Sequence, residues 1–385
     1  MNVNMMIKRG LALLSAVLFM FPMDMGIKSI ASDKEYTESY VLMEPETGTV
    51  VRERNGRERV RMGSFNKLMT VLLAAEAMDR GELTPDTVLT ASENANSKQG
   101  AQIWLMPGEK MTLDELLKGV IIGNANDAAC VIAEKIGGTE EKFTELMNKK
   151  AAELGMNDTL FTECTGYYGD SEQYTTAYDA ALLLCELYSH SQLTGYFTTR
   201  LDEIKGGEVQ LVSANPMGSG YKGSVGFKCG TGPESGYFAA EGAEREGIAF
   251  VCAVMDCENE DTALGLSEEL LDIGFGGYTA FVPEIPDDLP SDIAVKGGRK
   301  SAVKISAGVQ GKVLVSKGSE GDIEARVILP SFVYAPVKKG DKVGELRYYQ
   351  GSRLLRQTEL RAAESADKKN IINVLSDVMK FVVEF

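Results

Sequence analysis

The sequence predicts an α+β fold in which helices flank an antiparallel sheet, followed by a small all-β domain. Three observations lead to this prediction. A β-hairpin pattern opens the chain, a helical block fills its middle, and Gly-rich β segments with one closing helix follow after about residue 206. Beyond Pro283–Pro290, a Pro- and Asp-rich stretch typical of a linker, only short strand patterns between Gly-containing turns remain.

The first predicted elements are a hairpin and a helix. Tyr40–Met43 and Thr49–Arg52 are short strand patterns, and the segment between them contains proline and glycine, which favour a turn. Apolar residues at helical spacing then begin at Ser64 and end before Gly81. Ser64 is therefore expected at a helix N-terminus.

Three further helices are predicted in the middle of the chain. Thr112 starts a capping-box pattern in front of an apolar run that ends at Gly123. A second helix fits Asp127–Ile136, and Thr139 can cap a third that reaches Leu154 before a glycine.

The second half of the chain is dominated by strand patterns. Val225–Lys228, Gly236–Ala240 and Ile248–Met255 are predicted strands, and the last is apolar enough to be central in a sheet. A closing helix fits Thr262–Ile273. The strands predicted beyond the linker are Val303–Ile305, Lys312–Val315, Ile323–Leu329, Gly344–Tyr349 and Leu354–Leu360.

Size, charge and residue usage limit the function. A chain of 385 residues favours two folded units, and a net charge of -16 disfavours nucleic-acid binding, because that requires clustered Lys and Arg. The chain has six cysteines, no Cys-x-x-Cys pair and one histidine, His190, so we expect no metal site and no cofactor. Most cysteines are interpreted as buried small apolar residues, and a Cys252–Cys257 disulfide stays open.

The N-terminus has the pattern of a signal peptide spanning residues 1–31. Lys8 and Arg9 precede the apolar run Gly10–Phe21, and Ala31 offers a small residue for cleavage. This run is shorter than the ~20 residues of a bilayer-spanning helix. We expect an exported protein at the outer face of the cytoplasmic membrane or in the cell wall, with an uncleaved signal anchor as the alternative.

The C-terminal segment, residues 367–385, predicts an amphipathic helix. Ile371, Leu375 and Val378 share one helical face, whereas Asp377 and Lys380 lie on another. The apolar face is expected to contact a membrane peripherally; packing against the β domain or a partner helix is the alternative.

Ser64 and Lys67 form the first candidate catalytic pair. A serine and a lysine three residues apart on a helix share one face, and a desolvated lysine near a second cation can accept the hydroxyl proton. The spacing alone has low specificity, because it recurs at Ser219/Lys222, Ser301/Lys304 and Ser365/Lys368.

Two downstream segments make Ser64 the best candidate. Penicillin-binding proteins and class A β-lactamases combine Ser-x-x-Lys with a Ser-Asp-Asn-type and a Lys-Thr-Gly-type element, in that order. Here Asn124-Ala125-Asn126 follows a predicted helix, and Lys228-Cys229-Gly230 lies at the end of a predicted strand. The chain resembles the D-alanyl-D-alanine carboxypeptidases, the low-molecular-weight penicillin-binding proteins. Further segments that carry the resemblance are Met106-Pro107-Gly108-Glu109, Asn126-Asp127-Ala128-Ala129, Thr175-Thr176-Ala177-Tyr178-Asp179 and Ser235-Gly236-Tyr237.

The resemblance implies roles for individual residues. It implies that Ser64 forms an acyl-enzyme with a peptidoglycan stem peptide, with Lys67 as base, and that β-lactams react with the same serine. Asn126 would bind the substrate amide, and Lys228 would attract the terminal carboxylate. The other substrate-binding positions that it implies are Asn124, Cys229, Gly230 and Thr231.

The resemblance also implies a domain organisation. Residues 36–280 would form the penicillin-binding-protein/β-lactamase-like catalytic domain, and residues 291–363 a C-terminal β domain that holds it off the membrane.

Two residues depart from the family pattern. The family usually has serine where Asn124 stands and threonine where Cys229 stands, and neither an amide nor a thiol replaces a hydroxyl well. Two alternatives to a carboxypeptidase therefore stay open. One is a degenerate penicillin-binding fold that binds wall peptide or a partner with little turnover, and the other is a β-lactamase.

Overall fold

The computed structural model describes residues 38–167, 173–231 and 235–370. It divides into two units, the first ending at Gly276 and the second beginning at Gly277, and each has its own hydrophobic core. The predicted signal peptide, residues 1–31, lies outside the described residues.

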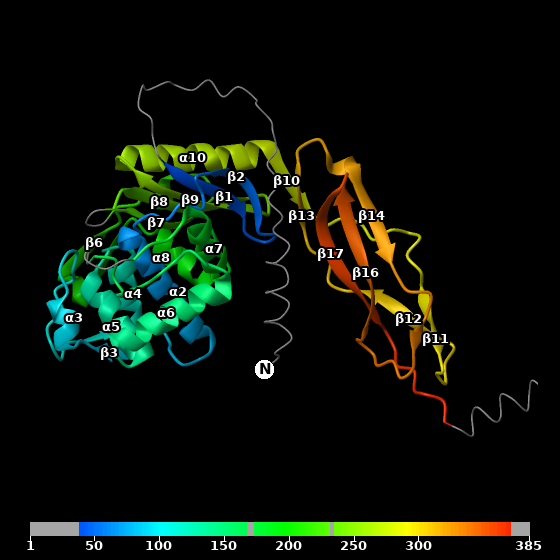
Figure 1. Cartoon of the computed structure of the whole chain (residues 1–385). Helices are drawn as coiled ribbons and strands as arrows, with labels where there is room; N and C mark the ends of the chain where they lie inside the picture. The colour runs from blue at the N-terminus through cyan, green and yellow to red at the C-terminus, as the bar shows by residue number, and fades with distance from the viewer. Residues whose placement is uncertain (1–37, 168–172, 232–234, 371–385) are drawn as a thin grey trace, which may run out of the picture. The chain divides into compact units, whose positions relative to one another are not determined.

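A five-stranded sheet forms the centre of the first unit, in the order β2-β1-β9-β8-β7 with all neighbouring pairs antiparallel (Figure 1). Residues 249–255 of the central strand β9 are all buried, as the apolar sequence predicts. The strands are β1 (Ser39–Glu44), β2 (Thr49–Arg54), β7 (Ser224–Gly230), β8 (Tyr237–Arg245) and β9 (Ile248–Cys257).

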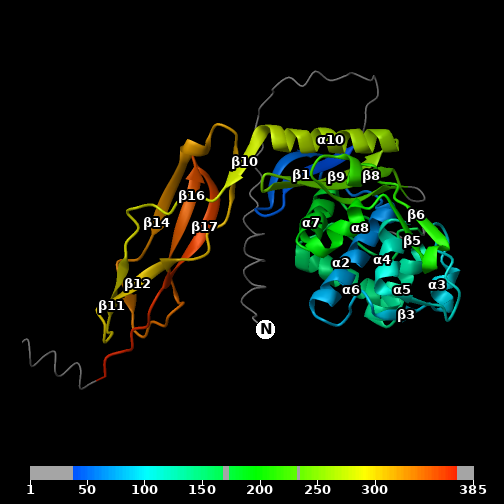
Figure 2. The same cartoon turned by 180° about the vertical axis from the view of Figure 1, so that it is seen from behind.

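Helices cover both faces of this sheet. α10 (Glu260–Gly277) lies on one face, and α7 (Ala177–Tyr188) lies with the other helices on the opposite face (Figure 1, Figure 2). The Sγ of Cys252 on β9 approaches the Ser267 carbonyl of α10 at 3.8 Å, whereas Cys185 of α7 lies 3.4 Å from the Met43 sulfur on β1. The predicted α+β arrangement of a flanked antiparallel sheet is thus confirmed.

The helical block contains α2 (Lys67–Asp79), α4 (Leu113–Ile121), α5 (Asn126–Gly137) and α6 (Glu140–Leu154). Its helix ends follow the local signals in the sequence. The side chain of Thr112 accepts from the Glu115 N–H while Glu115 reaches back to the Thr112 N–H, which completes the predicted capping box. Gly155 ends α6 at a φ of 80°, a conformation that glycine adopts at little cost.

Several elements of the first unit were not predicted. Most have three to five residues, too few for a hydrophobic period to show, while nine of the twelve residues of α7 are buried, so it has no polar face. The short elements are β3 (Val88–Thr90), α3 (Glu93–Ser97), β4 (Lys110–Thr112), η2 (Ser191–Leu193), α8 (Thr194–Thr198), β5 (Leu201–Ile204), η3 (Lys205–Gly207), β6 (Val209–Val212) and α9 (Met217–Gly220).

The second unit is a small β domain, as predicted, around a six-stranded sheet in the order β14-β16-β17-β12-β11-β15. Because β10 pairs with β13 of this unit, the division falls at Gly276 and Gly277, before the boundaries at 280 and 291 expected from the sequence. Its elements are β10 (Tyr278–Phe281), β11 (Asp292–Lys296), β12 (Ala302–Ala307), β13 (Val313–Ser316), η4 (Glu320–Asp322), β14 (Ile323–Ile328), β15 (Val333–Tyr334), β16 (Lys342–Gln350) and β17 (Arg353–Ala362).

The prediction that a C-terminal helix begins at residue 367 is wrong. Residues 367–370 are not helical: Lys368 forms an isolated β-bridge with Gly298, and the Lys369 N–H donates to the Gly297 carbonyl. These residues continue the edge of the β domain because its backbone offers them partners. The rest of the prediction, residues 371–385, lies outside the described residues.

Candidate active site

Ser64 lies in a 3₁₀ turn, η1 (Gly63–Asn66), that leads directly into α2, close to the predicted helix N-terminus. Its side chain is only 5 % exposed, and its Oγ has no hydrogen-bond partner among the described residues. The neighbouring Phe65 packs edge-to-face on Phe238 of β8, with ring centroids 5.7 Å apart, so the turn is anchored to the sheet. Because buried polar groups are normally paired, a buried unpaired hydroxyl is a candidate for function.

The end of β7 lies against this turn. A Cβ atom on Gly230 would meet the Ser64 Oγ at 2.9 Å, and the Ser64 N–H donates to the Thr231 carbonyl at 3.3 Å. The structure therefore brings together three residues predicted from the sequence, Ser64, Gly230 and Thr231.

Lys67 is a buried amine at the start of α2. Its side chain is 2 % exposed, and its Nζ donates to the Thr165 carbonyl at 2.8 Å. Burial, reinforced by the nearby positive charge of Lys228, lowers the pKa of Lys67 to about 7, and Glu163 opposes this shift. This lowered pKa favours the neutral amine of Lys67, which a general base requires.

Three successive carbonyls of the loop that holds Lys67 accept from the helical segment. Asn66 donates to the Glu163 carbonyl at 2.9 Å, and Thr70 donates to the Cys164 carbonyl at 3.1 Å, next to the bond from Lys67 to Thr165. Together these bonds fix the carbonyl that orients the Lys67 amine.

Glu163 shapes this loop through its own carboxylate. One oxygen accepts from both the N–H and the hydroxyl of Thr165 at 2.6 Å, and the other accepts from the Gly166 N–H and the Gln173 amide. Gly166 has a φ of 75°, and a Cβ there would meet the Gly63 carbonyl at 1.8 Å, so only glycine fits. Glu163, Thr165 and Gln173 are site residues that the sequence does not predict, because they act through the backbone that they position.

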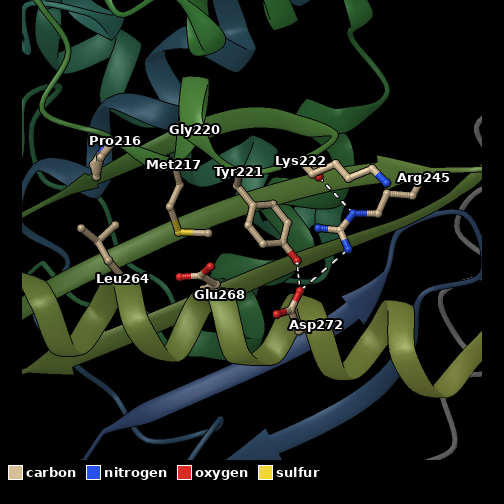
Figure 3. Close-up of a pocket in the computed structure, with 9 residues that line it drawn as sticks. All are labelled: Pro216, Met217, Gly220, Tyr221, Lys222, Arg245, Leu264, Glu268 and Asp272. Atoms are coloured by element: carbon tan, nitrogen blue, oxygen red, sulfur yellow. Dashed lines mark hydrogen bonds and ion pairs between the residues drawn. The ribbon is translucent and has the colours of Figure 1, made fainter.

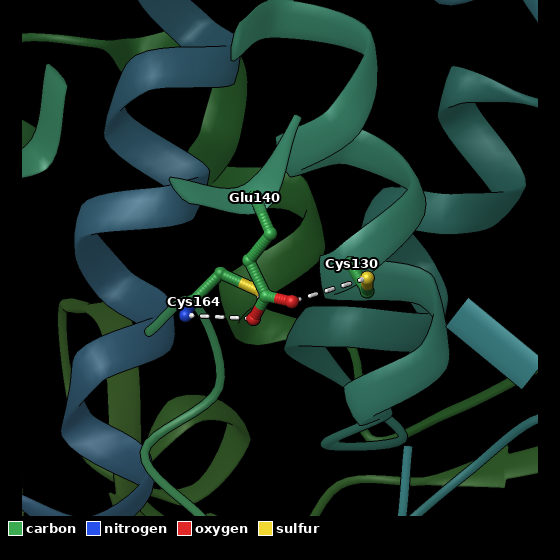
Figure 4. Close-up of side chains that lie close together, drawn as sticks. All are labelled: Cys130, Glu140 and Cys164. Carbon is green, nitrogen blue, oxygen red and sulfur yellow. Dashed lines mark hydrogen bonds between the residues drawn. The ribbon is translucent and has the colours of Figure 1, made fainter. Parts of the chain in front are cut away.

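Cys164 is anchored on its other side by Glu140 and Cys130. Figure 4 shows the Glu140 carboxylate between the two cysteines, with its Oε1 3.2 Å from the Cys164 Sγ and its Oε2 4.0 Å from the Cys130 Sγ. Lys98 pairs with the same carboxylate at 2.6 Å. Both cysteines are buried, which confirms the prediction from the sequence.

Lys228 and Cys229 point to different neighbours. Adjacent strand residues face opposite sides of a sheet. Lys228 is 6 % exposed, and burial lowers its pKa to about 8, while its charge lowers that of Lys67. The Cys229 thiol instead lies 3.7 Å from a carboxylate oxygen of Glu260 on α10, and burial raises the pKa of this thiol to about 12. Among the implied carboxylate-binding groups, Lys228 is near Lys67, whereas Cys229 is turned toward α10.

Asn124 lies between α4 and α5, and Asn126 lies at the start of α5. Asn126 is the first residue of α5 rather than part of the preceding loop, and its side-chain amide donates to the Gln99 carbonyl. Asn124 has a φ of 57°, a conformation that asparagine tolerates better than most residues. The Oδ1 atoms of both side chains are buried without a hydrogen-bond partner among the described residues, as the Ser64 Oγ is. Three of the predicted site residues thus present unpaired buried oxygens.

A separate pocket of about 490 Å³ lies at the α10 face of the first unit. Figure 3 shows that its walls come from the segment before β7, the end of β8 and α10, with Asp272 joined to Tyr221 and Arg245. None of the residues that line it is a predicted site residue, and we place no catalytic step there.

A sequence profile of the D-alanyl-D-alanine carboxypeptidases, peptidase family S11, matches residues 27–259. The chain belongs to this family. The profile of the C-terminal domain of penicillin-binding protein 5 matches residues 286–368, which includes the β domain.

Named relatives of this carboxypeptidase span almost its whole length. DacF, a D-alanyl-D-alanine carboxypeptidase of Bacillus subtilis, is 31 % identical over 346 residues, covering 89 % of each chain. DacC of Escherichia coli is 28 % identical and covers 97 % of this chain and 96 % of its own. Penicillin-binding protein 5 of Haemophilus influenzae has the same fold, with a TM-score of 0.77 at 23 % identity over 88 % of this chain and all of its own.

The family assignment confirms the predicted resemblance and enzyme class. The protein is a serine-type D-alanyl-D-alanine carboxypeptidase, and the comparisons lend no support to the degenerate binder or the β-lactamase. No helix within residues 38–167, 173–231 and 235–370 combines the length and apolar character needed to cross a bilayer.

Proposed function

We propose that Ser64 attacks the carbonyl carbon of the penultimate D-alanine of a peptidoglycan stem peptide. Its hydroxyl proton passes to the neutral Nζ of Lys67, an ester forms at Oγ, and the terminal D-alanine leaves after its nitrogen gains a proton. Water then hydrolyses the ester and regenerates the serine. The observation that carries this proposal is the buried amine of Lys67, held by the Thr165 carbonyl and with a pKa of about 7.

The backbone N–H groups of Ser64 and Thr231 are the proposed oxyanion donors. The Ser64 N–H donates to the Thr231 carbonyl at 3.3 Å, a long bond that a substrate carbonyl can replace. Donors fixed by the backbone need little reorganisation when negative charge develops in the transition state.

Lys228 and Asn126 are the proposed contacts for the rest of the substrate. A buried ammonium group attracts the terminal carboxylate strongly because little water screens it. The unpaired Oδ1 of Asn126 can accept from a substrate amide N–H, and Asn124 supplies a second acceptor but no hydroxyl for proton transfer. Gly230 leaves the space beside the Ser64 Oγ open.

β-Lactams should acylate the same serine. Penicillin-binding protein D2 of Listeria monocytogenes, 25 % identical over 62 % of this chain, has been solved in ampicillin-bound and cefotaxime-bound forms. We extend this reactivity to Ser64.

We also propose that the enzyme acts outside the cytoplasmic membrane, where its wall substrate lies.

Release of D-alanine from a peptide ending in D-Ala-D-Ala tests the proposed function. We expect turnover by the parent protein and none by Ser64→Ala, with the variant still folded by circular dichroism. A parent protein that binds the peptide without releasing D-alanine would instead support the degenerate binder.

A further inference from the structure

His190 has the geometry of a metal ligand. It is the one histidine of the chain, is 8 % exposed, and follows the end of α7. Its Nδ1 lies 2.9 Å from the Asp79 Oδ2, and Gln192 fixes the other oxygen of Asp79 with a bond of 3.0 Å. Its Nε2 is buried and has no hydrogen-bond partner among the described residues. A carboxylate that accepts from Nδ1–H leaves the Nε2 lone pair available, as in metal-binding histidines.

Two carboxylates lie where this lone pair can share a cation with them. Donor atoms of Glu76, Glu186 and His190 are all within 4.8 Å of one another, and the distance from Nε2 to the Glu186 Oε1 is 3.9 Å. A tetrahedral ion with bonds of about 2.1 Å holds its ligand atoms about 3.4 Å apart. Small side-chain rotations would therefore bring the three donors together.

The helix ends around these donors favour a cation. Glu76 lies in the last turn of α2 and Glu186 in the last turn of α7, and neither turn contains a basic residue. A carboxylate at a helix C-terminus is repelled by the helix dipole, whereas a cation there is stabilised.

The surrounding charges also leave room for a divalent ion. Lys150 pairs with Glu76 at 2.8 Å, but it also pairs with Glu153 at 2.7 Å, so it keeps a partner if Glu76 turns away. The ion pairs seen around the cluster among the described residues join five carboxylates to three lysine or arginine side chains. The carboxylates are Glu76, Asp79, Glu82, Glu153 and Glu186, and the cations are Arg80, Lys149 and Lys150.

We propose that Glu76, Glu186 and His190 form a binding site for a divalent transition-metal ion, with Zn²⁺ the best match. One imidazole nitrogen and two carboxylate oxygens suit zinc, whereas calcium and magnesium prefer oxygen ligands alone. Water would complete the coordination, since both glutamate side chains keep some exposure, 17 % and 23 %. The sequence predicts no metal because it has no Cys-x-x-Cys pair and a single histidine, but this type of site needs neither cysteine pairs nor several histidines.

The ion would join the C-terminal ends of α2 and α7. α2 carries the Ser64 turn at its other end, and α7 packs on β1 and β9, so the tie would brace the helix of the nucleophile against the sheet. Its expected effect is on stability, because a ligand that binds only the folded state raises the unfolding temperature. The site is independent of the proposed catalytic steps.

The other cluster of metal-binding side chains among the described residues is less suitable. Cys130, Glu140 and Cys164 are close together, but Lys98 already pairs with Glu140 at 2.6 Å, and the hydrogen bond with the Cys130 thiol, together with burial, raises the pKa of Cys164 well above its usual value. A metal there would have to displace a buried cation and remove protons from reluctant thiols.

Zinc binding by the chelator-treated full chain tests the proposal, measured by isothermal titration calorimetry with ZnCl₂. We expect one Zn²⁺ per chain and an unfolding temperature that rises by a few °C at saturation. His190→Gln should abolish the heat signal, and Glu186→Gln or Glu76→Gln should weaken binding about 10-fold or more. Glu82→Gln is the matched control, since it removes a nearby negative charge but no donor and should keep one site.

A second measurement uses Co²⁺ in place of Zn²⁺, because the visible absorption of bound Co²⁺ depends on its ligands. Co²⁺ should give visible absorption bands in the parent and in Cys130→Ser with Cys164→Ser, and none in His190→Gln. No saturable binding, binding that survives His190→Gln, or binding lost with the cysteines would overturn the proposal.

Discussion

A Cβ atom on Gly230 would lie 2.9 Å from the Oγ of Ser64, so the absence of a side chain at the end of β7 keeps the nucleophile accessible. The end of β7 thus lies directly against the turn before α2. Glycine is needed at position 230 on steric grounds, independently of the resemblance to other enzymes.

Gly230→Ala should reduce acylation by about 10²-fold with little loss of fold, because a displacement of about 1 Å at a nucleophile has that effect. Stopped-flow kinetics with a fluorescent penicillin measures it. Gly195→Ala is the control, since nothing lies within 4 Å of a Cβ added there. Equal acylation by the Gly230→Ala and parent proteins would show that the turn yields to the added methyl group.

The pH dependence of kcat/KM should be bell-shaped, with its maximum between about pH 7 and pH 8. Below the lower limit Lys67 is protonated and cannot accept the Ser64 proton, and above the upper limit Lys228 loses the charge that attracts the substrate carboxylate. Because both lysines are buried near each other, the two apparent pKa values of the profile describe the pair of lysines and not either residue alone.

Lys228→Gln provides the check on this assignment. Removing the neighbouring positive charge should raise the pKa of Lys67 and move the acidic limb to higher pH. A parent profile that stays flat well below pH 7 would count against Lys67 as the base.

Asn124 should limit turnover. Restoring the hydroxyl with Asn124→Ser should raise D-alanine release, whereas adding Cys229→Thr in a double variant should change it little, because the side chain at position 229 faces Glu260 on α10. Serine at the Asn124 φ of 57° should cost about 1 kcal/mol of stability, which thermal unfolding would reveal. If the parent releases D-alanine as fast as the double variant, its site is adapted rather than impaired.

Glu241 should make stability depend on pH. It is buried in β8, and desolvation raises its pKa to about 8, which the nearby Asn215 opposes only in part. A folded-state pKa above the unfolded value means that the folded protein holds the extra proton, so stability is fully present below about pH 4.5 and falls as pH rises to about 8.

The stability of Glu241→Gln relative to the parent should therefore be higher at pH 9 than at pH 5. The difference should be at most about 4 kcal/mol, since one pKa unit corresponds to about 1.4 kcal/mol. Urea unfolding at the two pH values measures the difference. The exposed Glu246→Gln is the control, and because it retains Glu241 it should keep the pH dependence of the parent. Equal unfolding curves for Glu241→Gln and the parent at pH 9 would mean that the carboxylate is solvated.

Local signals explain what the sequence predicts well. The capping box at Thr112, the glycine after Leu154 and the apolar run of β9 each act within a few residues, so each can be recognised without the fold. Ser64 and Lys67 share one helical segment, and the order of the later motifs was enough to find Lys228.

Long-range contacts explain what the sequence missed. The carbonyl that orients Lys67 belongs to Thr165, which lies 98 residues away and contributes backbone, so residue identity gives no signal. The thiol of Cys229 faces Glu260 only because β7 and α10 pack together. Likewise, Glu76, Glu186 and His190 meet through the packing of two helix ends.

The site of β-lactam attachment tests the central claim most directly. The protein would be incubated with penicillin and digested, and the modified peptide identified by mass spectrometry. We predict one adduct, on Ser64, absent from Ser64→Ala and retained when Ser219, Ser301 or Ser365 is replaced by alanine. An adduct on one of those three serines, or one that persists in Ser64→Ala, would contradict the assignment of Ser64 as the nucleophile.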